Sequence, residues 1–198
     1  MIVPLGAVAV ILAQALSADA LATALDPNPS LSSYVAAAAL DARARPIPIH
    51  KKLSGTAYYQ NHQRKIVFDN VSGILAKFKE LSAAVPTYAQ VQETYDISAP
   101  VDDGKLSTFT LVPKKTGTRV NKLILTIDDA TKLLSRATWG YTNGSSLQFD
   151  SYYTSDGIFN LESKIDIHAK FPGYSVVGTM NLTDYRTNVP IPDAIFGP

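Results

Sequence analysis

The most constraining feature of the chain is the alternation of apolar and polar side chains in residues 158–171. A period of two over this length predicts a long β-strand with one buried face and one solvated face. Several similar stretches surround it, so we expect a protein that is mainly one large antiparallel sheet. The apolar set is Phe159, Leu161, Ile165, Ile167, Ala169 and Phe171, and the polar set is Asn160, Glu162, Lys164, Asp166, His168 and Lys170.

Length and composition fit one fairly large domain with its own core. The chain has 198 residues, of which 46% are hydrophobic, so a folded core is expected and global disorder is not. The net charge is +1 and the sequence has no run of five or more basic residues, which argues against nucleic acid as a partner. Cysteine is absent, which excludes disulfides, thiolate metal sites and a lipobox cysteine for acylation.

The N-terminus predicts export. Residues 2–18 carry no charge and are mostly Val, Leu, Ile and Ala, and Ala20-Leu21-Ala22 is a small-x-small site. We therefore expect a signal peptide over residues 1–22, a mature chain that begins near Thr23, and a periplasmic or secreted protein. A retained membrane anchor and a helix of a cytoplasmic protein are the alternatives. The apolar stretch is at the short end of what spans a bilayer.

The rest of the chain is predicted as a linker and one domain. Residues 23–33 form the linker, because Asp26-Pro27-Asn28-Pro29-Ser30 places two prolines in five residues. Residues 34–198 form the β domain. Its first strand is expected at residues 34–45, although four consecutive alanines there also fit a helix.

One amphipathic helix is predicted within the domain. It covers residues 71–81, where apolar side chains recur at helical spacing and form one stripe. The stripe is Val71, Ile74, Leu75, Phe78 and Leu81. The remaining strands are expected at residues 53–60, 65–69, 91–98, 106–113, 120–128, 133–142, 146–153, 158–171 and 174–186.

Short turns connect these strands. Asp103-Gly104, Asn143-Gly144 and Asp156-Gly157 supply residues that tolerate positive φ, and Pro172-Gly173 turns the last pair. Consecutive short turns predict that consecutive strands are antiparallel neighbours.

No catalytic or metal-binding constellation is found in the sequence. The three histidines, His50, His62 and His168, have no zinc-like spacing. Asp166 and His168 share a strand face, but they fit a solvated polar face better than a metal site. We therefore expect no enzymatic activity, no metal and no cofactor.

The strand patterns resemble a known family. Leu111-Val112-Pro113-Lys114 followed by residues 120–128 resembles a strand pair of the LolA/LolB-like periplasmic lipoprotein carriers. Residues 53–59 followed by Lys65-Ile66-Val67-Phe68 are similar to an earlier pair of that family, without the proline expected between them. The resemblance covers residues 34–196.

The resemblance implies a mainly β (α+β) fold: a strongly curved antiparallel sheet that forms an incomplete barrel and is covered by one or two short helices. An apolar cavity between sheet and helix would bind the acyl chains of lipids or lipoproteins, with residues 71–81 as the lid. Plain core packing is the alternative for each lining residue. The expected lining is Tyr59, Phe68, Ile74, Phe78, Leu111, Leu125 and Trp139.

The function implied by the resemblance is therefore a non-catalytic carrier or binder. We expect a monomer whose ligands are acyl chains and which has an envelope protein as a further partner. The alternative is an envelope sensor or structural interaction domain of the same fold with a filled core. A hydrolase or sugar-active enzyme is disfavoured, because such chemistry needs paired carboxylates in apolar surroundings.

Overall fold

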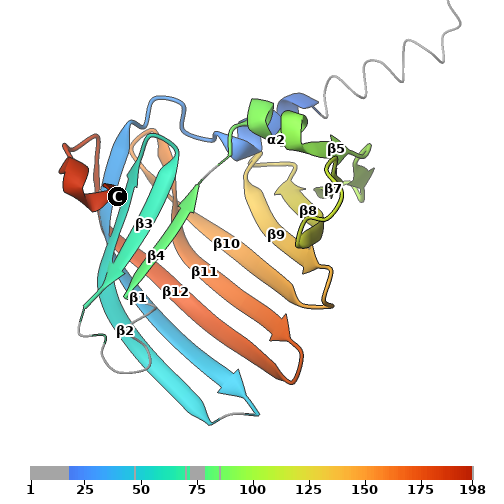
Figure 1. The fold of residues 1–198 in the computed structure, drawn as a ribbon. Coiled ribbons are helices and arrows are strands. Elements are labelled where there is room, and N and C mark those ends of the chain that lie inside the picture. The colour runs from blue at the N-terminus through green and yellow to red at the C-terminus, as the bar shows by residue number, and fades with distance from the viewer. Residues whose placement is uncertain (1–17, 47, 70, 72–78, 85, 198) are drawn as a thin grey trace, which may run out of the picture.

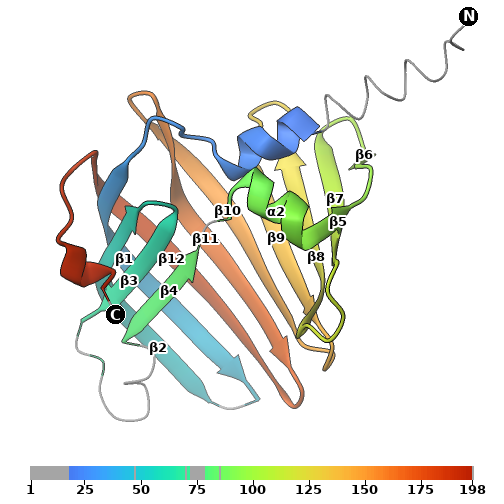
Figure 2. The same cartoon turned by 45° about the horizontal axis from the view of Figure 1, so that its top comes forward.

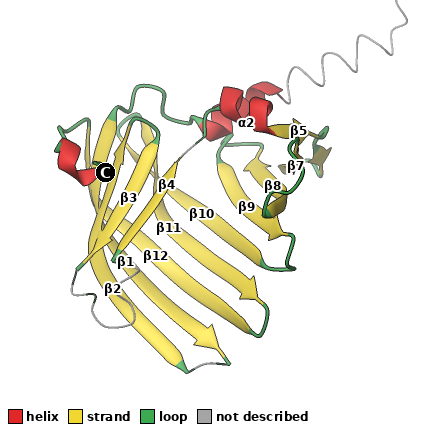
Figure 3. Ribbon diagram, in the orientation of Figure 1, coloured by secondary structure: helices red, strands yellow, loops and turns green. Residues whose placement is uncertain are grey.

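A computed structural model of the chain describes residues 18–46, 48–69, 71, 79–84 and 86–197. The fold is one 12-stranded antiparallel sheet in the order β4-β3-β2-β1-β12-β11-β10-β9-β8-β7-β5, with β6 paired to β7. The sheet curves strongly and does not close (Figures 1 and 3). The predicted fold class, an incomplete barrel with short helices, is confirmed.

The strands are β1 (Ser33–Arg45), β2 (Ile49–Gln60), β3 (Gln63–Phe68), β4 (Glu80–Ala84), β5 (Tyr95–Ile97), β6 (Val101–Asp102), β7 (Leu106–Pro113), β8 (Val120–Asp128), β9 (Leu134–Tyr141), β10 (Ser146–Asp156), β11 (Phe159–Phe171) and β12 (Tyr174–Thr187). The helices are residues 18–25, α2 (Tyr88–Thr94) and the 3-10 helix η2 (Asp193–Ile195).

The predicted strand at residues 158–171 is β11. Phe159, Leu161, Ile165 and Ala169 are buried, whereas His168 and Lys170 are exposed. The register against β10 shifts once, because Tyr152 pairs with Lys164 and Tyr153 with Glu162. Ser163 is therefore an extra residue in β11, and a bulge of this kind interrupts the alternation of side chains.

A close approach of two strands explains one glycine. A Cβ atom on Gly55 of β2 would lie 2.2 Å from the carbonyl oxygen of Val67 in β3, so only glycine fits. β3 and β4 turn over the inner face of the sheet beyond this point (Figures 1 and 2). β2 and β3 can therefore approach this closely only with glycine at position 55.

The prediction of a helix over residues 71–81 is wrong at the two ends of this range, which the structure describes. Val71 is not helical, and Leu81 lies in β4, opposite Ile66 of β3. Pairing with the free edge of β3 satisfies the backbone groups of β4, which outweighs a weak local helical pattern. Residues 72–78, with Ile74, Leu75 and Phe78, lie outside the described residues.

The predicted strand at residues 91–98 is also wrong, because its first half belongs to α2. Thr87 caps this helix: its side chain accepts a hydrogen bond from the backbone N–H of Gln90, and the Gln90 side chain accepts one from the backbone N–H of Thr87. This Thr-x-x-Gln capping box is readable in the sequence and predicts a helix start. Only Tyr95–Ile97 is strand, as β5.

Residues 18–25 are helical and pack against the sheet. Leu21 is 1% exposed and Ala24 is 4% exposed, and both belong to an apolar cluster with β7, β8 and β9. Residues 26–32 form neither helix nor strand, as the linker composition suggests. Processing after Ala22 stays a prediction, and it would remove the buried side chain of Leu21.

Truncation tests this packing. A chain that starts at Thr23 should be less stable than one that starts at Ala18 by about 1.5–3 kcal/mol, the typical contribution of one fully buried leucine. Urea denaturation of the two proteins measures the difference. Equal stabilities would show that Leu21 is dispensable and that a mature start at Thr23 is compatible with the fold.

Substitution in β11 tests the register. Ile165→Asp should lower the free energy of unfolding by about 3 kcal/mol or more, because Ile165 is 4% exposed and its replacement buries an unpaired charge. Lys170→Asp is the matched control on the same strand, since Lys170 is exposed. Similar losses in both variants, measured by chemical denaturation, would contradict the register.

Candidate functional site

The apolar side chains form two clusters. The first cluster lies on β1, β2, β3, β11 and β12, and includes Tyr34, Phe68, Ile165 and Leu182. The second cluster lies under the two helices and contains Leu21, Ala24, Val91, Phe109, Leu111, Leu123, Leu125, Ile127 and Ala137. Figure 2 shows the helix of residues 18–25 beside α2 at this end of the sheet.

Aromatic side chains connect the two clusters. Trp139, at the border of the second cluster, meets Phe149, at the border of the first, edge to face with ring centroids 5.5 Å apart. Neighbouring strands place Leu125, Ala137, Phe149 and Ile167 on one face of the sheet. The apolar inner face is thus continuous from β8 to β11.

The predicted lining residues fall into these two groups rather than into one. Tyr59 and Phe68 belong to the first cluster, and Leu111, Leu125 and Trp139 belong to the second. Phe68, Leu111 and Leu125 are almost completely buried by the protein itself, whereas Tyr59 and Trp139 are half-buried. Ile74 and Phe78 lie outside the described residues. Phe149 was missed as a member of this face.

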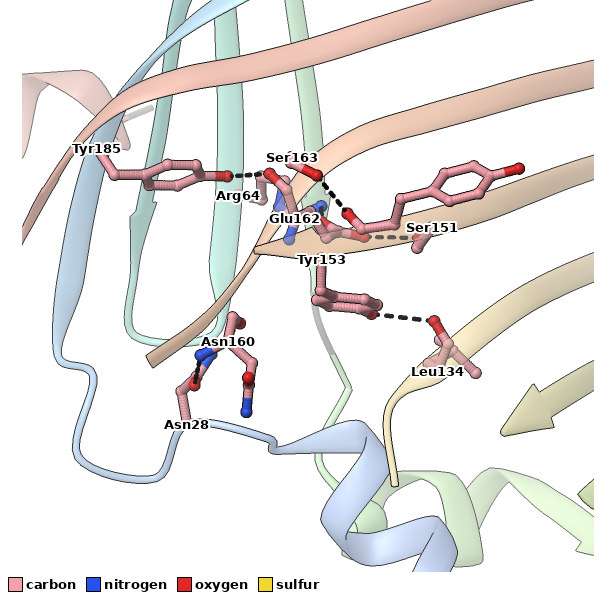
Figure 4. A network of polar contacts seen from close by, with 10 residues as sticks. Asn28, Arg64, Leu134, Ser151, Tyr153, Asn160, Glu162, Ser163 and Tyr185 are labelled. Atoms are coloured by element: carbon pink, nitrogen blue, oxygen red, sulfur yellow. Dashed lines mark hydrogen bonds and ion pairs between the residues drawn. The ribbon is translucent and has the colours of Figure 1, made fainter. Parts of the chain in front are cut away.

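A polar network interrupts the apolar interior (Figure 4). Nη1 of Arg64 in β3 lies 2.6 Å from Oε2 of Glu162 in β11, with the side chains 27% and 12% exposed. The hydroxyl of Ser151 donates to Oε1 of Glu162 over 2.7 Å, and the hydroxyl of Tyr185 donates to the Glu162 carbonyl oxygen over 2.7 Å. The ion pair therefore ties the turned-over strand β3 to the centre of the sheet.

This network corrects two assignments from the sequence. Glu162 was placed on the solvated face, and Arg64 fell in the turn between the predicted strands at residues 53–60 and 65–69, but both side chains are largely enclosed. The extra residue Ser163 interrupts the alternation of β11 next to Glu162. The turn before β3 is also shorter than predicted, since only Asn61 and His62 have positive φ there.

Tyrosines surround the ion pair. The ring of Tyr34 stacks on Tyr59 at 5.3 Å and meets Tyr185 edge to face at 5.2 Å. Burial is the main cause that raises the pKa of Tyr34, Tyr153 and Tyr185 above the ordinary value. Among the described residues the Tyr34 hydroxyl has no hydrogen-bond partner, although Arg64 lies beside it.

The opposing effects on Arg64 favour its charged form. Burial lowers the pKa of the Arg64 guanidinium, whereas the neighbouring Glu162 carboxylate and the tyrosines raise it. The raising effects together are larger, so the pKa lies above its ordinary value. Arg64 therefore remains a cation inside the fold. Its Nε atom makes no hydrogen bond with another described residue.

A polar cleft lies between β9 and β10. Their pairing ends at Arg136 and Asp150, while β10 continues to Asp156. The cleft has a volume of about 620 Å³, and its lining includes Asp128, Arg136 and Asp150. Tyr153 crosses it, since its hydroxyl donates to the Leu134 carbonyl oxygen over 3.0 Å. These polar walls do not suit an acyl chain.

Within the part of the chain that the structure describes, no three His, Asp or Glu side chains are grouped as a metal site would require. In the same part, no helix is both long enough and apolar enough to cross a membrane.

Known structures share this architecture. A DUF1329 family protein from Desulfovibrio piger matches with a TM-score of 0.63 and 14% identity, over 91% of this chain and 95% of that one. A LolA superfamily protein from Nitrosomonas europaea matches with a TM-score of 0.60 and 11% identity, over 92% and 97%. The chain has the LolA-like fold. No family model and no curated protein sequence matches it.

A third structure extends the same likeness. A domain from Vibrio parahaemolyticus, named for outer membrane lipoprotein sorting, matches with a TM-score of 0.62 and 10% identity, over 93% of this chain and 97% of that one. The chain is therefore divergent in sequence, and the structural match to the LolA-like fold extends over almost the full length of the chain.

The enclosed tyrosines predict late ionisation. The raised pKa values mean that the folded protein holds these phenolic protons above pH 10.0, the ordinary tyrosine value, while the unfolded chain releases them. The corresponding stability is fully present below about pH 10 and is lost as the pH rises further. Absorbance titration of the ten tyrosines should show a delayed group that ionises together with unfolding. Ionisation of all ten near pH 10 in the folded state would contradict this.

Proposed function

We propose that this protein is an exported, non-catalytic binder or carrier of lipid or lipoprotein acyl chains. The observation that supports this most is the continuous apolar inner face of an open, curved sheet, partly covered by two short helices. An acyl chain would lie on that face and replace contacts with water by contacts with apolar side chains, at about 25 cal/mol per Å² of buried apolar surface.

The proposed contact residues keep the expected lining: Tyr59, Phe68, Leu111, Leu125 and Trp139, with Ile74 and Phe78, to which we add Phe149. Small side chains adjoin this face, because Ala38 of β1 pairs with Gly55 of β2 and Ala42 of β1 pairs with Gly178 of β12. Periplasmic or secreted localisation and a monomeric state belong to the same proposal.

One observation favours a second candidate. Phe68 and Leu111 are 1% and 0% exposed, so other side chains of the protein already cover them, which suits a filled core. In that case the protein would be an envelope sensor or structural interaction domain that binds a protein partner through its surface.

Fluorescence of the single tryptophan separates these functions. Trp139 is half-buried and touches Phe149. A polyene fatty acid bound on the inner face should therefore quench the Trp139 fluorescence by accepting its excitation energy. Phe149→Glu should weaken binding of this probe by about tenfold or more, because it places a charge in the apolar site.

Tyr152→Glu is the matched control. It adds the same charge to the same strand, but Tyr152 is 47% exposed and its ring lies under the Lys164 ammonium. This variant should bind the probe as the wild type does. Absence of saturable probe binding by the folded wild type would reject the carrier and leave the sensor or structural domain.

A further inference from the structure

The charges of the sheet are divided between its two ends. One end, here called the basic rim, consists of residues 41–46, 48–52, 114–122 and 168–175, which belong to the ends of the β1–β2, β7–β8 and β11–β12 hairpins. It carries nine of the chain's 18 lysines and arginines and only one acidic residue, Asp41. All nine are exposed: Arg43, Arg45, Lys51, Lys52, Lys114, Lys115, Arg119, Lys122 and Lys170.

Strand register places these segments along one edge of the molecule. Arg45 pairs with Ser175, which pairs with Lys170, and the row continues through Ser146 and Gly140 to Lys122. The hairpin ends lie in a row along the lower right edge in Figures 1 and 2. The cations therefore lie along one edge of the sheet although they are distributed over the sequence.

The opposite ends of the strands have the reverse charge. Residues 102–106, 128–134, 154–160 and 184–188 contain six aspartates and three lysines or arginines. The aspartates are Asp102, Asp103, Asp128, Asp129, Asp156 and Asp184. The net charge of +1 thus hides a strongly polarised molecule.

The basic rim also contains a hollow of about 920 Å³. Arg45 and Lys170 line it together with the hydroxyl-bearing residues Ser146 and Ser175, and no acidic residue does. Two cations beside serine hydroxyls form a suitable environment for a phosphate group, which accepts charge-assisted hydrogen bonds.

Apolar side chains are exposed among these cations. Ile49 at the start of β2 is 44% exposed, Tyr174 is 40% exposed and Val177 is 41% exposed, and the last two also line the hollow. Tyr174 stacks on Phe171 with ring centroids 4.7 Å apart. Apolar and aromatic side chains flanked by Lys and Arg suit a membrane interface better than a purely ionic partner.

We infer that the basic rim docks on an anionic lipid bilayer, and that the hollow between Arg45 and Lys170 receives a lipid phosphate. The acidic opposite end points away from the membrane in this orientation. Electrostatic attraction falls off within about 10 Å at moderate salt, so only the rim contributes strongly. The inference goes beyond the proposed acyl binding and does not require it.

Vesicle co-sedimentation tests the docking surface. The wild type should bind vesicles of phosphatidylglycerol and phosphatidylcholine, bind phosphatidylcholine alone weakly, and be released by salt. Arg45→Glu combined with Lys170→Glu should weaken binding by about 25-fold or more, since each lost cation accounts for about fivefold. A milder pair, Lys51→Gln with Lys115→Gln, keeps the hollow intact and should also weaken binding.

Lys105→Glu combined with Lys132→Glu is the matched control, because both residues are exposed at the acidic end. It makes the same change of net charge and should leave vesicle binding unchanged. Equal loss in this control, or equal wild-type binding to neutral vesicles, would overturn the inference. Binding to polyglutamate but not to anionic vesicles would overturn it as well and indicate an acidic protein partner.

Acyl-probe binding by the same variants separates this inference from the proposed function. The rim variants should bind the polyene fatty acid as the wild type does, because the altered side chains lie at the rim and not among the proposed contact residues of the inner face. Vesicle binding without probe binding would support the rim and reject the carrier.

Discussion

The pairing of β1 with β12 makes one sheet out of the two ends of the chain. The register runs from Tyr34 opposite Thr187 to Arg45 opposite Ser175, with one irregularity near Ala36. Without it, β2, β3 and β4 would be separated from the strands β7 to β11, and each part would expose an unpaired edge. The curvature of the inner face, the Arg64–Glu162 contact and the alignment of the basic rim all depend on this long-range pairing.

Local patterns predicted most strands, because alternation and turn residues act over short distances. β7, β8, β11 and β12 follow apolar–polar alternation, and Gly144, Gly157 and Gly173 adopt positive φ at the turns where glycine was expected. α2 was missed because the Thr87–Gln90 capping box was overlooked. The strand order was not readable, because no local signal specifies that the first strand pairs with the last.

The candidate site was predicted only in part, for a similar reason. Phe68, Leu111 and Trp139 belong to or border apolar clusters, and their role as a ligand lining stays a prediction. Their division between two clusters depends on how the sheet curves. The ion pair of Arg64 and Glu162 depends on a bulge and on contact between distant strands. Such a pair loses most of its hydration, and its Coulomb energy roughly offsets that loss, so the pair adds little net stability.

The basic rim shows how strand register produces a surface that composition conceals. Arg43-Ala44-Arg45, Lys51-Lys52 and Lys114-Lys115 are each too short to indicate a polyanion partner, and the acidic turns cancel them in the net charge. Antiparallel pairing brings alternate hairpin ends to the same edge, so the three basic hairpin ends lie on one side and the aspartate-containing ends at residues 102–106, 128–134, 154–160 and 184–188 lie on the other. A carrier built this way would approach an anionic membrane in one orientation, because rotation by half a turn would present the aspartates instead.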